Sequence, residues 1–170
     1  MIFDGQWKRE LRNLSREITF WRKMTMFSHI AEHRLNRAIL YSAIILRKII
    51  EEERDAEGIN AENGLPETSL KVLYAKISAM QYPYIAEEGW TAWGTFCASD
   101  YSKGESVSLD AQLMCHWLIH SCIWSLAHDD SKRYSGFLVA SDRQRETHVH
   151  CVTFDEWLQL IELAIKQGAF

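Results

Sequence analysis

The first third of the chain has a helical pattern of apolar and polar positions. Between residues 6 and 57 there is neither glycine nor proline, and apolar residues recur every three or four positions. The positions that show this spacing best are Leu35, Ile39, Ala43, Leu46 and Ile50. One unbroken helix of this length would be about 75 Å long, which exceeds the diameter of a domain of this size. We therefore expect two helices, with the break at Ser15 or Ser28.

The middle of the chain has a weaker pattern. Residues 57–67 gather glycine, asparagine and proline, which predicts that the helix ends in a loop there. Residues 69–77 fit the spacing of either a strand or a helix, and we expect a strand. Residues 81–106 contain three glycines, one proline and little periodicity, so we expect them to be mostly irregular.

Three further elements are predicted after this region. A nearly continuous apolar run predicts a helix from about Ser108 to about His128. Two β-rich runs joined by a charged turn predict a hairpin over residues 136–152. A last helix is expected over Asp155–Gln167, because Thr153 and Glu156 have the spacing of a capping box.

Taken together, these elements predict an α+β fold that is dominated by helices. It would consist of long N-terminal helices, a small antiparallel sheet that includes the 136–152 hairpin, and a C-terminal helix. The 170 residues suffice for one ordinary hydrophobic core, so we expect a single globular domain over residues 1–170.

Composition and charge narrow the class of protein. The longest uncharged apolar run is too short to span a bilayer, and the N-terminus carries charge where a signal peptide needs an apolar stretch. We expect no membrane association and a cytoplasmic location, where Cys97, Cys115, Cys122 and Cys151 would be free thiols. The net charges of residues 1–50, 51–130 and 131–170 are +6, −10 and 0, so the parts of the chain can neutralise each other.

The stretch MCHWLIHSCIW places His116 and His120 four residues apart in an apolar run. On a helical wheel they share a face with apolar residues, so we expect both rings to be largely buried and at least one to be hydrogen-bonded outside its helix. The spacing also suits zinc, but Trp117 stands where a HExxH motif has its glutamate. Further ligands would have to come from His29 and His33, or from His148, His150 and Cys151. We predict no metal and no cofactor.

The segment CHWLIH, residues 115–120, resembles the signature of HEPN domains, which are small helical domains, many of which cleave RNA. In that signature an arginine, followed by a polar residue, precedes a histidine. The resemblance implies that His120 matches the family's histidine and His116 its polar residue, and that both are catalytic. Cys115 stands at the position of the arginine, so the positive charge near the scissile phosphate would be missing.

A second cluster is expected at the 136–152 hairpin. Strand alternation places His148 and His150 on one side, with Arg143 and Arg145 in the turn. Such a group can hold a phosphate or a nucleic-acid backbone through charge-assisted hydrogen bonds. Alternatively, Asp142 and Glu146 pair with the arginines in a solvated turn.

No motif in the chain is specific for one reaction. We therefore expect a small intracellular binding or regulatory protein without catalytic activity, with a protein partner or with self-association as a dimer, since long amphipathic helices commonly pack against partners. The alternative is a HEPN-like ribonuclease or a metal-assisted hydrolase built on His116 and His120, with RNA as its partner.

Overall fold

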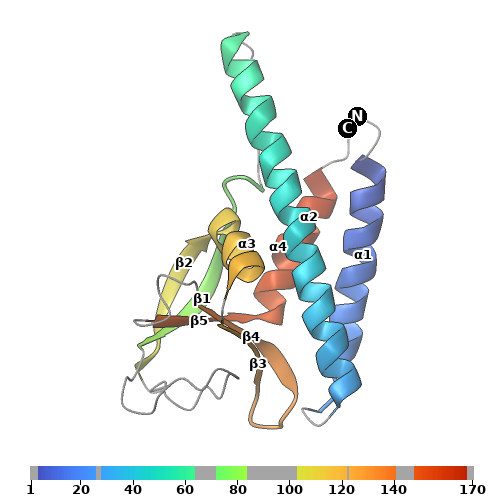
Figure 1. The fold of residues 1–170 in the computed structure, drawn as a ribbon, viewed down its shortest axis with the longest axis vertical. Helices are drawn as coiled ribbons and strands as arrows, with labels where there is room; N and C mark the ends of the chain where they lie inside the picture. The colour runs from blue at the N-terminus through green and yellow to red at the C-terminus, as the bar shows by residue number, and fades with distance from the viewer. Residues whose placement is uncertain are drawn as a thin grey trace.

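The computed structural model describes residues 4–25, 28–63, 72–83, 103–121, 123–140 and 148–167. These residues include four helices and five strands (Figure 1). Along the chain they are α1 (Asp4–Trp21), α2 (His29–Glu62), β1 (Lys76–Pro83), β2 (Glu105–Asp110), α3 (Ala111–His120), β3 (Ile123–His128), β4 (Tyr134–Ala140), β5 (His148–Thr153) and α4 (Phe154–Gln167). The α+β fold predicted from the sequence is confirmed.

The break between the two long helices lies at Ser28, which was one of the two expected positions. The Ser28 hydroxyl accepts a hydrogen bond of 3.2 Å from the backbone N–H of Ala31, so this serine caps the first turn of α2. Ser15 lies inside α1. After the break, α1 packs along the first half of α2 as an antiparallel neighbour (Figure 1).

The five strands form one antiparallel sheet in the order β2-β1-β5-β4-β3. β4 and β5 pair directly, which confirms the 136–152 hairpin, and β5 pairs on its other side with β1. The last strand in the chain is thus the central strand of the sheet.

The prediction of one helix from about Ser108 to about His128 is wrong at both ends. Residues 105–110 form β2 and residues 123–128 form β3, so only ten residues between them are helical. An apolar run without glycine or proline fits a strand and a buried helix equally well, and sheet pairing decides between them. Likewise, the strand expected over residues 69–77 begins only at Lys76, and α2 continues to Glu62, into the loop expected at 57–67.

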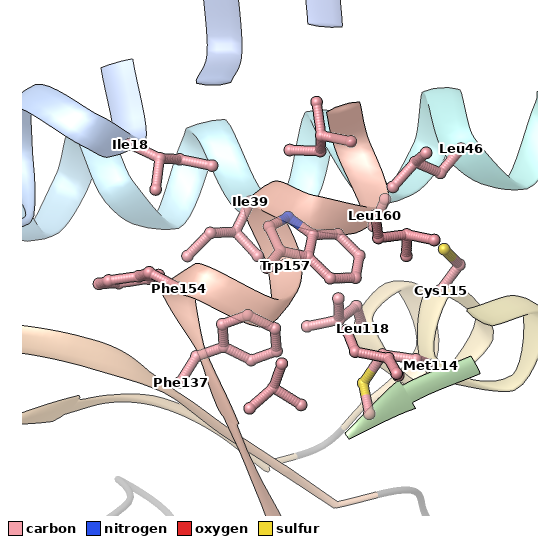
Figure 2. Packing of buried hydrophobic residues seen from close by; sticks show 14 of the residues in the cluster. Ile18, Ile39, Leu46, Met114, Cys115, Leu118, Phe137, Phe154, Trp157 and Leu160 are labelled. Carbon is pink, nitrogen blue, oxygen red and sulfur yellow. The ribbon is translucent and has the colours of Figure 1, made fainter. Parts of the chain in front are cut away.

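The core is centred on Trp157 of α4, which is fully buried between the helices and the sheet (Figure 2). Its ring meets Phe137 of β4 edge-on, with the ring centroids 5.6 Å apart. Its indole N–H donates to the hydroxyl of Ser42 at 2.9 Å, and that hydroxyl donates to the carbonyl of Ile39 at 2.8 Å. The Ser42 hydroxyl is therefore buried with its hydrogen bonds satisfied.

The helices cover one face of the sheet, and α2 extends past the other elements at its C-terminal end (Figure 1). On the opposite face of the sheet, a smaller cluster is formed by Leu138, Ala140 and Val149, all buried. Within the described ranges, no helix is both long enough and apolar enough to cross a membrane.

Candidate functional site

His116 and His120 lie on the exposed side of α3, so the expectation that both are largely buried is wrong. The buried side of the helix carries Ala111, Met114, Cys115, Trp117 and Leu118. The wheel that predicted burial assumed one helix from residue 109 to 128. Because Leu109 and Ala127 belong to strands, they do not surround the imidazoles. The two rings are neighbours, with centroids 4.7 Å apart.

His120 has a partner on α2, as expected for at least one of the two histidines. Its Nε2 atom lies 3.2 Å from Nη1 of Arg47. A guanidinium can only donate hydrogen bonds, so Nε2 accepts and the ring proton is on Nδ1. The Nε atom of Arg47 donates to Glu51 at 3.0 Å, which orients the guanidinium toward α3.

A second contact of the same kind lies further along the two helices. Arg54, two turns after Arg47 on α2, donates to the side-chain oxygen of Gln112 on α3. Gln112, His116 and His120 are four residues apart and therefore share one side of α3. Two polar rows thus face each other, with His116 between the two contacts.

These rows border a groove of about 560 Å³ between α2 and α3. Its walls also include apolar side chains, which are Leu73 and Leu113, and the aromatic ring of Tyr74. The complete lining is Arg47, Arg54, Glu57, Leu73, Tyr74, Asp110, Gln112, Leu113 and His116. A volume in this range is typical of sites that bind small molecules.

The carboxylates near the groove are already engaged. Glu57 accepts from the hydroxyl of Tyr74, Asp110 pairs with Lys76, and Glu51 pairs with Arg47. Arg54, in contrast, contacts the neutral amide of Gln112 and forms no ion pair with a described residue. Among the described residues, Arg47 therefore has a carboxylate partner and Arg54 has none, while the Glu57 carboxylate in the same lining is hydrogen-bonded to a neutral hydroxyl rather than to a cation.

The second cluster expected from the sequence is placed differently. His150 is 1% exposed, and its ring lies between the sheet and α3, with its centroid 4.8 Å from that of Trp117. Its Nε2 atom is 3.1 Å from the side-chain oxygen of Gln81, and its buried Nδ1 atom has no partner in the described part of the chain. His148 is half-buried on the same strand face, while Arg143 and Arg145 fall outside the described residues.

Burial controls the protonation of His150. Burial, which is the larger cause, and the neighbouring His148 together lower the pKa of His150 from 6.5 to about 4. The neutral ring donates from Nε2 to the oxygen of Gln81, so His150 acts as a polar core residue that ties β5 to β1.

Metal ligands do not gather in the described ranges, where no group of three His, Cys, Asp or Glu side chains is placed to hold an ion. His29 and His33 lie in the first turns of α2, about 27 Å and about 21 Å along the helix from Arg47, so they do not meet the pair on α3. Burial raises the pKa of Cys115 to about 12 and that of Cys151 to about 11, so both are thiols rather than thiolate ligands at neutral pH.

Sequence reasoning missed Arg47, Arg54 and Gln112. The two contacts join residues 73 and 58 positions apart, a separation that no local motif reports. A weak signal was present, because the two arginines are seven residues apart on one helix and the α3 residues are four apart.

None of the family models, curated proteins or solved structures that we compared with the chain matches it.

Proposed function

We propose that this protein is a binding protein that takes a phosphate-bearing ligand in the groove between α2 and α3. One observation carries the proposal: two guanidinium groups from α2, those of Arg47 and Arg54, face a row of neutral donors and acceptors on α3. Guanidinium groups match the geometry of phosphate oxygens and bind them in bidentate fashion.

The remaining walls support a ligand with an organic part. Leu73 and Leu113 offer apolar surface, and the ring of Tyr74 lies at the same groove. A free phosphate ion would leave most of the 560 Å³ unfilled. A ligand of nucleotide size fits better, with its phosphate between the arginines and its ring on the apolar wall.

The phosphate group has neutral polar partners as well as cations. His116 and Gln112, which line the groove, can present a ring N–H and an amide, and His120 lies beside Arg47 just outside the lining. Ligand oxygens would replace Nε2 of His120 and the oxygen of Gln112 as acceptors for the two arginines. Each contact with a neutral acceptor would be exchanged for a hydrogen bond between two charged groups, which is stronger.

A second candidate function is RNA cleavage on the same helix, as the resemblance of residues 115–120 to HEPN domains implies. Arg47 supports it, because its guanidinium lies beside His120 and provides the positive charge that Cys115 lacks. Two neighbouring imidazoles can also act as a general base and a general acid. The two candidates share the groove and differ in whether the bound phosphodiester is broken.

The test measures binding of three probes by calorimetry: inorganic phosphate, a ribonucleoside monophosphate and a short single-stranded RNA. We expect the nucleotide to bind more tightly than phosphate. Arg47→Gln and Arg54→Gln should each weaken binding about tenfold or more, because a hydrogen bond to a charged group contributes about 1.5–3 kcal/mol.

Lys48→Gln is the matched control, since Lys48 is an exposed cation on the same helix that does not line the groove. It should leave binding unchanged. Equal affinities for the wild type and both arginine variants, or no binding of any probe, would overturn the proposal. RNA that is degraded by the wild type and not by His120→Ala would instead establish the second candidate.

A further inference from the structure

The solvent side of α1 carries a row of cations. Arg9, Arg12 and Arg16, here termed the α1 basic row, are all exposed, and Phe20 continues the row toward the end of the helix. At about 100° per residue, these four positions lie within about 80° of each other around the helix axis. The three guanidinium groups therefore start from one strip of the helix surface about 10 Å long.

This row faces away from the rest of the protein. The buried residues Leu11, Leu14 and Ile18 lie on the other side of the helix, where α1 packs against α2 and α4. In Figure 1, α1 lies at the edge of the molecule. The row is therefore open to solvent along its whole length.

The charge of the row is not neutralised within the described part of the chain. None of its three arginines forms an ion pair with a described residue, whereas the next arginine, Arg22, contacts Asp155 at 2.6 Å. No acidic residue falls within the arc of the row, because Glu10 and Glu17 lie about 80–100° away from it. Glu17 is also paired with Arg37 of α2 at 2.8 Å. The strip is thus purely basic in a chain whose net charge is −4.

We propose that the α1 basic row binds a single strand of nucleic acid. Guanidinium groups in a row match phosphates that follow each other along one strand, and a flexible strand can adapt its phosphate spacing to the helix. Phe20 is 55% exposed, and Trp21 meets its ring edge-on with the centroids 4.9 Å apart, which holds the ring in place. An exposed aromatic ring beside a row of cations can stack with a base.

The row suits a nucleic acid better than an anionic membrane. A helix that lies in a membrane surface buries its apolar face in the lipid. The apolar face of α1 is already buried in the protein core, and Phe20 is the one large apolar side chain of the exposed row. Too little apolar surface is therefore available on this side of α1 for insertion into lipid.

This surface is separate from the groove between α2 and α3, since none of the residues that line the groove belongs to α1. The proposal therefore does not depend on phosphate binding in the groove.

The salt dependence of RNA binding tests the proposal. The probe is a single-stranded RNA of mixed sequence, titrated by fluorescence anisotropy at several salt concentrations. The logarithm of the binding constant falls with the logarithm of the salt concentration, with a slope of about −0.7 per phosphate contact for single strands. We expect Arg9→Gln, Arg12→Gln and Arg16→Gln each to reduce the steepness by about 0.7. Lys48→Gln is the matched control, because Lys48 is an exposed cation that pairs with Glu52 on α2, and it should leave the slope unchanged.

Phe20→Ala tests the stacking contact. It should weaken RNA binding about fivefold or more and leave the salt slope unchanged. Phe20→Tyr keeps an aromatic ring and should bind as tightly as the wild type. Circular dichroism of each variant shows whether it is folded.

A wild type that does not bind the RNA at low salt would refute the proposal, as would equal salt slopes for the wild type and all three arginine variants. Equal affinity for an RNA duplex would contradict recognition of a single strand. Binding to vesicles that contain phosphatidylserine, without binding to RNA, would assign the row to a membrane instead. Binding of the ribonucleoside monophosphate should be unchanged in the α1 variants, so the groove and the row can fail separately.

Discussion

The pKa of His150 links the stability of the protein to pH. Its pKa is about 4 in the folded state and 6.5 in the unfolded chain, so the unfolded chain binds more protons between these values. The free energy of unfolding is therefore highest above pH 6.5 and decreases as the pH falls toward 4. We expect His150 to account for about 1–3 kcal/mol of this loss.

Urea denaturation at a series of pH values measures this dependence. His150→Phe removes the titrating group and keeps a ring beside Trp117, so its stability should depend less steeply on pH between 6.5 and 4. His29→Gln is the control, since the His29 side chain is 98% exposed. Parallel pH profiles for the wild type and His150→Phe would show that protonation of His150 does not govern acid stability.

At the residue scale, the sequence could identify His116 and His120 but not their surroundings. Their spacing predicted correctly that they share one side of a helix. The expected bond outside the helix is present at His120, but it was inferred from a burial that the structure does not show. Their exposure was predicted wrongly, because it depends on where α3 ends. Their partner Arg47 belongs to a helix that reaches α3 only through tertiary packing.

Within the sheet, the pairing of β4 with β5 depends on one small residue. A Cβ atom added at Gly136 would lie 2.2 Å from the backbone oxygen of Val152, and no change of rotamer could relieve that contact. We expect Gly136→Ala to destabilise the protein by about 2 kcal/mol or more.

The matched control is Gly58→Ala on α2, where an added Cβ meets nothing within 4 Å. Alanine favours helix over glycine, so this variant should be stabilised by about 0.5–1 kcal/mol. Thermal denaturation of both variants compares them. A Gly136→Ala protein as stable as the wild type would show that β4 and β5 can separate without loss.

At the scale of elements, the sequence predicted helix starts correctly where a side chain can hydrogen-bond to the first turn. Ser28 was one of the two serines expected at the break between the helices, and it caps α2. Thr153 accepts the backbone N–H of Glu156 at 3.2 Å at the start of α4. The Glu156 carboxylate completes no capping box, since it accepts instead from the backbone of Ser78 on β1. Residues 123–128 failed as a helix because pairing with β4 outweighs their local preference.

For the molecule as a whole, stability should vary strongly along α2. Residues 39–50 include its most deeply packed positions, whereas the end of the helix after Glu57 extends past the body (Figure 1), and residues 58, 59, 61 and 62 are exposed. Amide hydrogen exchange should therefore be slow in residues 39–50 and fast in residues 58–62. Uniform protection of both segments would contradict this expectation.

The α+β class followed from counting periodic segments, and the structure confirms it. The strand order did not follow, because it depends on which edges meet after the helices pack. β1 and β5 pair at Met80 and Cys151, for example, and no sequence pattern in either strand indicates that the other strand is its partner. The groove between α2 and α3 also depends on how elements far apart in the sequence pack together, so local sequence patterns could not predict it.

The central position of β5 also bears on how the chain reaches its fold. During synthesis, β1 and β2 and then β3 and β4 leave the ribosome before β5 does. The pair β1–β2 and the pair β3–β4 can therefore form early, but they cannot join into one sheet until β5 is available between them. Until the last strand inserts, each pair carries an open edge, and open edges promote aggregation. Closure of the sheet is thus a long-range step that waits for β5, so we expect folding to be slow for a chain of this length.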